Sequence, residues 1–230
     1  MSARRASNST TLAKSCDAVR VLALNTAFAA CEAAVAQDGR ILLERREAMA
    51  RGQDARLALF VDEALTEAGL RLEDLDRLAV VVGPGSFTGV RIGVAFARGL
   101  ALALDIPCIG VSSLEAVVPP DTPGAVLAVL PAQRREPDVT YWAQRFADGV
   151  ATDRPSERVL DELVSTAAGE DVVIIGDGLG SLAARSPEAR RHESRARASI
   201  AALRAAGMDP AANPAVPDYA RTPDAAPMAR

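Results

Sequence analysis

The chain has 230 residues, of which 49% are apolar and 24% charged, and its formal net charge at pH 7 is −4. This composition is sufficient for a sizeable hydrophobic core and excludes a globally disordered chain. The acidic balance argues against a protein that coats nucleic-acid phosphates with lysine and arginine, although RNA contact within a larger assembly stays possible. The length fits one large domain or two small lobes.

Histidine and cysteine are too few for the common metal and nucleophile sites. The sequence holds one histidine, His192, and three cysteines far from one another, Cys16, Cys31 and Cys108. No CxxC or HxxxH pair occurs, so we expect no bound metal. A Ser-His-Asp or Cys-His enzyme would need His192 as its base, but this residue lies among charged neighbours, which is typical of a solvated helix end.

The same inventory bears on localisation. Three scattered thiols and the lack of a recognisable signal peptide favour a reducing, cytoplasmic compartment. The longest apolar stretches are interrupted by Arg91 and Arg98. The sequence therefore predicts no membrane span and no membrane partner.

Residues 1–19 are polar and without a hydrophobic period, and we expect a disordered extension rather than a mitochondrial-type presequence. The following residues, 20–118, predict a first lobe in which an Asp-Gly hairpin turn joins the second and third strands and Gly69 ends the first helix. Its element order is βββαβαβ, with strands at 21–24, 31–36, 41–46, 78–82 and 108–111, helices at 53–68 and 90–104, and a short helix at 113–118 capped by Ser112.

The Pro- and Gly-rich segment 119–124 predicts a linker to a second, smaller lobe. This lobe is expected over 125–206, with strands at 125–130, 139–146 and 172–175 and helices at 156–166 and 194–206. The tail, 207–230, is rich in Pro and Ala and predicts an extended strap on the surface.

The best candidate for chemistry is the loop between a strand and a helix that reads Gly83-Pro84-Gly85-Ser86-Phe87-Thr88-Gly89. Its glycines would let backbone amides approach a ligand, and a helix N-terminus favours phosphate. No lysine follows as in a Walker A loop, and Thr88 stands where a GxGxxG motif needs its third glycine. On local chemistry, a tight turn with Thr88 as helix N-cap is favoured over a phosphate loop.

Two other polar turns follow predicted strands. Asn25 and Thr26 could contact a nucleotide phosphate or a metal, but Asn25 is a weaker metal ligand than Asp, so a turn-capping role is favoured. The segment Gly176-Asp177-Gly178-Leu179-Gly180 has its third glycine one position too early for dinucleotide binding. A simple turn is the better interpretation, although it could line a nucleotide cleft between the lobes.

The helix predicted over 90–104 is apolar around nearly its whole circumference. Two series of small residues repeat at four-residue spacing: Gly93, Ala97 and Ala101, and Ala95, Gly99 and Ala103. Either both sides are buried within one domain, or one side packs on a sheet and the other meets a partner. The residues alone leave both interpretations open.

The string GPGSFTGVRIG at 83–93, with VLALNT at 21–26 and IGVSSL at 109–114, resembles the TsaB (YeaZ) family. The resemblance is strong over 20–118 and fainter at 134–142 and 217–221. It implies an α/β fold of two actin-like or Hsp70-like lobes, each a mixed β-sheet with flanking helices. It also implies a non-catalytic subunit of bacterial tRNA threonylcarbamoyladenosine synthesis.

The resemblance further implies the partners. They are the catalytic subunit TsaD in a heterodimer, the ATPase TsaE in a wider assembly, and tRNA through the complex, with a homodimer when the chain is alone. The two helices at 53–68 and 90–104 would form the contact. The residues expected in it are Leu57, Phe60, Val61, Ala64, Val90, Gly93, Val94, Ala97 and Ala101. The motif loop of the family would be 83–89 with Arg91.

No catalytic residue or cofactor is implied for this chain, apart from ADP or ATP at the interface with the partner. TsaD-type relatives hold a metal with two helix histidines, which the helix at 53–68 lacks, and nothing supports the peptidase label that some relatives carry. Asn25 replaces the acid of the family's Asp-Thr, and 130–135 departs from its Asp-Ala-Arg pattern. Both departures argue against a functional ligand cleft between the lobes.

The alternative is a stand-alone actin-like enzyme that hydrolyses nucleotides or transfers phosphate. It would place four polar side chains near the phosphates: Asn25, Thr26, Ser86 and Thr88. However, it lacks an acid that would hold Mg²⁺ or activate water, because Asn25 is neutral. A dinucleotide-dependent enzyme built on 176–180 ranks lower still.

Overall fold

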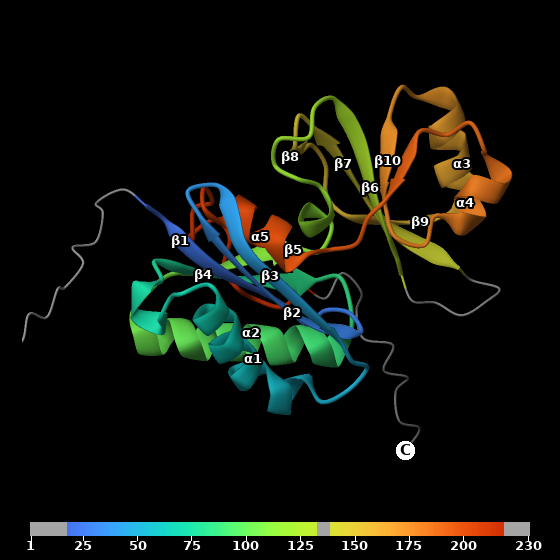
Figure 1. Cartoon of the computed structure of the whole chain (residues 1–230). Coiled ribbons are helices and arrows are strands. Elements are labelled where there is room, and N and C mark those ends of the chain that lie inside the picture. The colour runs from blue at the N-terminus through green and yellow to red at the C-terminus, as the bar shows by residue number, and fades with distance from the viewer. Residues whose placement is uncertain (1–17, 133–138, 219–230) are drawn as a thin grey trace, which may run out of the picture.

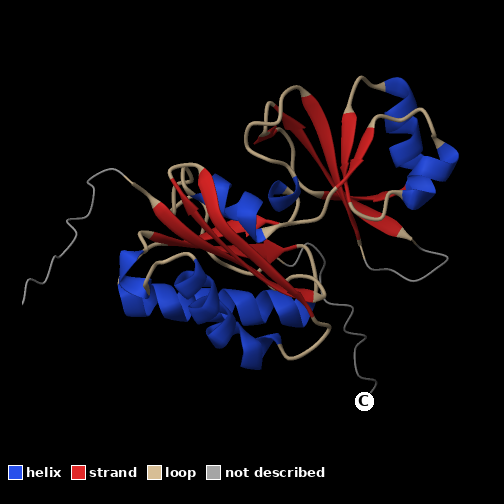
Figure 2. Ribbon diagram, in the orientation of Figure 1, coloured by secondary structure: helices blue, strands red, loops and turns tan. Residues whose placement is uncertain are grey.

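The computed structural model describes residues 18–132 and 139–218, which form two lobes around two β-sheets (Figure 1). Helices cover both faces of the first sheet, whereas the helices of the second lobe gather on one side of its sheet (Figure 2). The expected α/β fold of two mixed sheets with flanking helices is confirmed.

The first sheet has the strand order β3-β2-β1-β4-β5. Its first three strands are antiparallel neighbours, and β4 and β5 run parallel to β1. The bounds are β1 (Arg20–Asn25), β2 (Ala30–Gln37), β3 (Arg40–Ala48), β4 (Arg77–Gly83) and β5 (Cys108–Ser112). The predicted hairpin turn is present, with positive φ at Asp38 and Gly39, as a type I′ turn requires.

Three helices cover this sheet. α1 (Gln53–Glu67) and α2 (Phe87–Leu104) lie on one face, and α5 (Ala198–Ala205) lies on the other (Figure 1). α2 begins before the predicted residue 90 because Ser86, and not Thr88, is its N-cap: the Ser86 hydroxyl accepts a hydrogen bond from the Gly89 amide at 3.2 Å. The short helix expected after β5 is the 3-10 helix η2 (Glu115–Val117), and another, η1 (Leu72–Asp74), precedes β4.

The second sheet has the order β11-β10-β6-β7-β8, and β9 also pairs with β7. Its strands are β6 (Ala125–Pro131), β7 (Thr140–Ala147), β8 (Val150–Ala151), β9 (Ser156–Val159), β10 (Val173–Gly176) and β11 (Arg191–Glu193). α3 (Leu160–Gly169) and α4 (Gly180–Arg185) complete the lobe. Leu163 of α3 and Leu182 of α4 pack with Leu127 of β6 and Ile174 of β10 in a separate small core.

Two expectations for this lobe are wrong. The helix predicted over 156–166 begins only at Leu160, because 156–159 pair with β7 as a strand. His192 does not lie at a helix end. It belongs to β11, where it pairs with Ile175 of β10 and its side chain is exposed.

The expected boundary of the second lobe at residue 206 is also wrong. The helix predicted over 194–206 is the shorter α5, which packs against β1, β2 and β4 of the first sheet. Its alanines Ala198, Ala201 and Ala205 are buried in the first core. The chain therefore returns to the first lobe directly after β11.

The described part of the expected strap, 207–218, runs beside the outer edge of β5 and the end of β4. The Gly110 amide donates to the Asn213 carbonyl at 2.9 Å, and the Asp218 amide donates to the Val82 carbonyl at 2.8 Å. The expectations for 1–17 with Cys16, for 133–138 and for 219–230 fall outside the described residues.

By length and composition alone, α2 is the one described helix that would suffice to cross a membrane, with a mean hydropathy of 1.5. Arg91 and Arg98 were expected to exclude a membrane span, but by length and composition they do not. The inner side of α2 packs against β4 and β1, and Val90, Val94 and Ala97 are buried there. This packing is that of a core helix.

Candidate functional site

The glycine-rich loop of residues 83–89 packs on the end of β1. The Thr26 hydroxyl donates a hydrogen bond of 2.7 Å to the Gly89 carbonyl. A Cβ on Gly89 would collide with the Thr26 carbonyl oxygen, and one on Gly93 would collide with the Thr26 hydroxyl. These glycines therefore allow close packing between α2 and β1, which supports the tight-turn interpretation over a phosphate loop.

Other residues of the loop also take part in packing, although Phe87 and Thr88 are exposed. The Ser86 amide donates to the Ala27 carbonyl at 2.7 Å, and Pro84 is buried. The Arg91 guanidinium lies 3.8 Å from the centroid of the Phe87 ring, a distance at which a cation and a ring attract each other. The loop fixes the start of α2 rather than presenting a ring of amides.

Asn25 is buried and its side-chain amide is fully engaged. Its Nδ2 donates to a Glu32 carboxylate oxygen at 3.1 Å and to the Ala196 carbonyl at 3.0 Å. Its Oδ1 accepts from the Ala27 amide at 3.0 Å. Asn25 therefore has the turn-capping role, whereas the equally buried Thr26 bonds to Gly89 of α2. The expected nucleotide contact has no support here.

The nine residues expected to contact a partner all lie on the inner sides of α1 and α2. Each is buried within this chain, from Ala97 at 0% exposure to Ala101 at 4%, with Gly93 also buried. The expectation assigned them to the wrong side of the helices: they form the contact with the chain's own sheet. Of the two small-residue series in α2, the one that contains Ala95, Gly99 and Ala103 is exposed.

The outer side of the two helices is exposed and carries large apolar side chains. Leu102 is 84% exposed and Leu59 is 57% exposed. A depression of about 420 Å³ is lined by Arg98, Gly99, Leu102 and Cys108. We call the exposed outer sides of the two helices, with Leu59 on α1 and Ala95, Arg98, Gly99 and Leu102 on α2, the two-helix face. Large exposed apolar side chains of this kind are typical of protein interaction sites.

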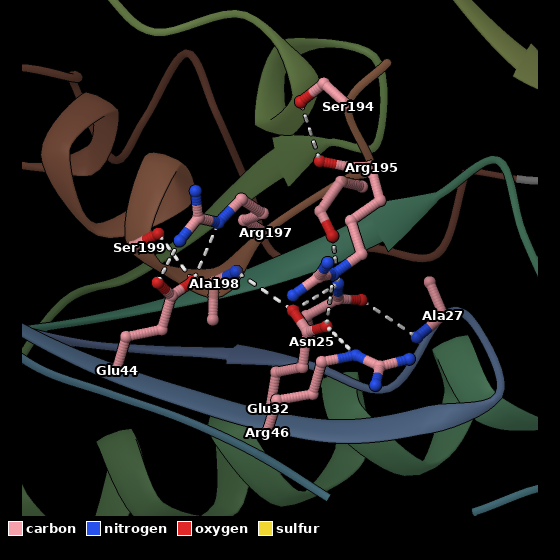
Figure 3. Close-up of polar contacts among 11 residues, drawn as sticks. Asn25, Ala27, Glu32, Glu44, Arg46, Ser194, Arg195, Arg197, Ala198 and Ser199 are labelled. Atoms are coloured by element: carbon pink, nitrogen blue, oxygen red, sulfur yellow. Dashed lines mark hydrogen bonds and ion pairs between the residues drawn. The ribbon is translucent and has the colours of Figure 1, made fainter. Parts of the chain in front are cut away.

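A second candidate site lies between the lobes, where Glu32 of β2 forms a buried polar cluster (Figure 3). Its carboxylate accepts hydrogen bonds from Asn25 Nδ2, from Arg46 Nε at 3.0 Å and from the Ala198 amide at 3.2 Å. Arg195 Nε approaches the same carboxylate at 3.6 Å. Burial raises the pKa of Glu32, and the hydrogen bonds and the arginines only partly offset this effect.

A neighbouring cluster holds residues 194–199 onto β3. These residues lead from β11 into the start of α5, and we call them the return segment. Glu44 pairs with Arg197 through two hydrogen bonds, one of 3.0 Å from Nε, and accepts another from Ser199 at 2.7 Å. Burial alone would raise the pKa of Glu44, but these partners outweigh it, so the pKa is lowered. The two carboxylates together anchor the segment that leads from β11 into α5.

A cavity of about 300 Å³ opens beside Glu32. It is lined by Phe28, Ala29, Glu32, Arg46, Leu130, Pro131, Asp177, Arg195 and Ala196. The turn at 176–180 leads from β10 into α4 and reaches the cavity through Asp177, so it is a simple turn at the border of an inter-lobe space. Within 18–132 and 139–218, no group of three His, Cys, Asp or Glu side chains is arranged to hold a metal.

Comparison with known proteins identifies the family. A family model described as TsaD, tRNA N6-adenosine threonylcarbamoyltransferase, matches residues 47–137. The protein Rv3421c of Mycobacterium tuberculosis, which carries no functional description, is 37% identical over 91% of this chain and 95% of its own length. The tRNA threonylcarbamoyladenosine biosynthesis protein TsaB of Escherichia coli is 38% identical over 148 residues. The chain belongs to the TsaB (YeaZ) family.

The solved structure of a TsaB-family member, YeaZ from Pseudomonas aeruginosa, agrees with the fold. It superposes with a TM-score of 0.64 at 27% identity and covers 87% of this chain and 99% of its own. The alignment with E. coli TsaB covers 62% of this chain and 62% of that protein. The family expected from the motif at 83–93 is thus confirmed.

Sequence reasoning missed the inter-lobe cluster. Glu32 and Ala198 are 166 positions apart, and no local pattern connects them. The one available signal was a charged residue, Glu32, within an otherwise apolar strand. Such a residue needs partners when it is buried.

Proposed function

We propose that this chain is a non-catalytic subunit of the machinery that makes threonylcarbamoyladenosine in tRNA, and that it activates a TsaD-type transferase by binding it. Support comes from the relatives in E. coli and Haemophilus influenzae that are named tRNA threonylcarbamoyladenosine biosynthesis protein TsaB. In this proposal the assembly works in the cytoplasm and includes a TsaE-type ATPase and tRNA, and the chain alone forms a homodimer.

The observation that carries the proposal is the two-helix face. Leu102 and Leu59 expose large apolar side chains on two helices whose inner sides are already packed. The small residues Ala95 and Gly99 leave the backbone of α2 open to close approach, and a Cβ on Gly99 would meet nothing within 4 Å. A partner helix can therefore approach this surface closely, as ridge-and-groove packing requires.

Catalysis by this chain has little support in its own residues. Asn25 and Thr26 are engaged in internal hydrogen bonds, and the loop at 83–89 is packed against β1. We therefore assign the transfer chemistry to the TsaD-type partner, and place any ADP or ATP at the interface with that partner.

Sedimentation velocity of the chain alone, and mixed with TsaD from the same organism, tests the proposal. We expect a homodimer that exchanges into a 1:1 heterodimer. Gly99→Glu should weaken this heterodimer at least about thirtyfold, because it places a charge in an apolar interface.

The matched control is Gly169→Glu, which changes another exposed helical glycine without neighbours within 4 Å, on α3 of the second lobe. It should leave the heterodimer unchanged. Gly99→Glu should also retain a folded chain, since it replaces an exposed helical glycine. An unchanged heterodimer with Gly99→Glu would contradict the assignment of this surface, and a chain indifferent to TsaD would contradict the function.

A further inference from the structure

The cavity between the lobes is built from three parts of the chain. β2 and β3 contribute Glu32 and Arg46, the second lobe contributes Leu130 and Asp177, and the return segment contributes Arg195 (Figure 3 shows Glu32, Arg46 and Arg195). Its volume of about 300 Å³ lies at the lower end of the range of roughly 300–1,000 Å³ that is usual for small-molecule sites. It suits a ligand much smaller than a nucleoside triphosphate.

Two arginines supply the positive side of the cavity. Arg46 and Arg195 each point Nε at the same oxygen of Glu32, at 3.0 and 3.6 Å. Within the described residues, the terminal nitrogens of both guanidinium groups make no other hydrogen bond or ion pair. Their side chains are 38% and 52% exposed. Glu32 thus holds two guanidinium groups side by side, and planar guanidinium donors match a carboxylate well.

The negative side comes from the second lobe. Asp177 follows β10, lines the cavity and is exposed, and no described residue donates to its carboxylate. The wall between the charged groups is apolar, with Phe28, Leu130 and Pro131 among its residues. The cavity therefore offers donors for an anionic group, an acceptor for a cationic group, and apolar surface for a small side chain.

We propose that this cavity binds a small α-amino acid with an apolar side chain. Its carboxylate would lie against Arg46 and Arg195, and its ammonium group would face Asp177. Because the ligand would contact both lobes and the return segment, binding would hold them together. This inference does not rest on the proposed function.

Isothermal titration calorimetry with three matched compounds tests the proposal on the full chain. L-leucine carries both charged groups, 4-methylpentanoate lacks the ammonium group, and isoamylamine lacks the carboxylate. We expect leucine to bind at least about tenfold more tightly than either analogue, since each lost charge-assisted contact costs about that factor. Equal affinities for leucine and 4-methylpentanoate would contradict recognition of the ammonium group and overturn the proposal of an amino-acid ligand. If none of the three compounds released or absorbed heat on titration, the proposal of a binding site would be overturned.

Two variants locate the binding. Arg195→Gln and Asp177→Asn should each lower the affinity for leucine at least about tenfold. Asp177→Asn should leave the affinity for 4-methylpentanoate unchanged. The matched controls are Arg154→Gln and Asp121→Asn, exposed residues outside the cavity, which should leave the affinity for leucine unchanged. Leucine binding that is unaffected by both cavity variants would place the ligand elsewhere and overturn the proposal.

Discussion

The Thr26 hydroxyl donates a hydrogen bond of 2.7 Å to the carbonyl oxygen of Gly89 and so joins the end of β1 to the first turn of α2. Both residues are buried. This close approach favours glycine at position 89 of this chain. There is no room for a Cβ between the helix backbone and the turn after β1.

Gly89→Ala should therefore destabilise the chain by about 2–3 kcal/mol, because the added methyl group must displace backbone atoms of Thr26. Urea unfolding measures this change. Gly99→Ala is the control: its Cβ meets nothing within 4 Å, and it should stabilise the helix by about 0.5–1 kcal/mol. Equal stability of the two variants would contradict the packing argument.

Arg204 of α5 should hold α5 against η2 and, through its contact with Gly149, against the second lobe. Its half-buried guanidinium donates to the carbonyls of Glu115, Val118 and Gly149, at distances from 2.6 to 3.0 Å. Burial lowers the pKa of Arg204, but at neutral pH the group is charged. Arg204→Met leaves these carbonyls without their donor and should cost about 2–4 kcal/mol in unfolding free energy.

The control for this variant is Arg185→Met. Among the described residues, Arg185 pairs only with Asp161, at the surface of the second lobe, where an ion pair contributes about 0–1 kcal/mol. Urea unfolding and limited proteolysis between the lobes should both distinguish the two variants. A similar small effect of both would show that Arg204 does not tie the lobes together.

The pH dependence of stability should show an effect of Glu32. Its folded pKa is raised by burial, so the folded state binds more protons than the unfolded state between the two pKa values. Stability therefore falls as the pH rises through that window. Glu32→Gln removes this titration. The stability of the variant relative to the wild type should increase as the pH rises above the ordinary pKa of a glutamate.

Glu170 should contribute a pH dependence of stability with the opposite sign to that of Glu32. A hydrogen bond from Arg145 lowers the pKa of Glu170, so its contribution is present above the unfolded pKa and is lost as the pH falls through the folded pKa. Glu170→Gln should therefore become less stable relative to the wild type as the pH rises. The same slope for both variants in denaturant titrations would refute the assignment.

The two described cysteines should react slowly with iodoacetamide. Burial raises the pKa of both Cys31 and Cys108 to about 11, and only the thiolate is nucleophilic. Near neutral pH we expect reaction at least about a hundredfold slower than in the urea-unfolded chain. Mass spectrometry of each cysteine peptide measures the rates, and a native Cys108 that reacts at the unfolded rate would contradict its placement.

Local signals were sufficient for most of the first lobe. The Asp-Gly turn and the stop at Gly69 involve neighbouring residues, so the sequence predicted them correctly. The helix cap was assigned to Thr88 because both Ser86 and Thr88 suit an N-cap, and only the backbone direction decides between them. The strand β9 was missed because its short polar sequence forms a strand only by pairing with β7.

The larger errors concern contacts between distant segments. α2 is apolar on both sides, so helical spacing identified two small-residue faces but not which one the sheet covers. The assignment of α5 to the second lobe failed for a similar reason. Its alanines suit any core, and it is the anchoring of the return segment to Glu32 and Glu44 that brings it to the first sheet.

The segment beside β5 has a consequence for how copies of this chain can meet. Pro214 forms a β-bridge with Ile109, and Pro217 follows shortly after it. Proline has no backbone N–H to donate to a further strand. The two prolines therefore hinder growth of the sheet from this edge, which is the usual route to strand-by-strand aggregation.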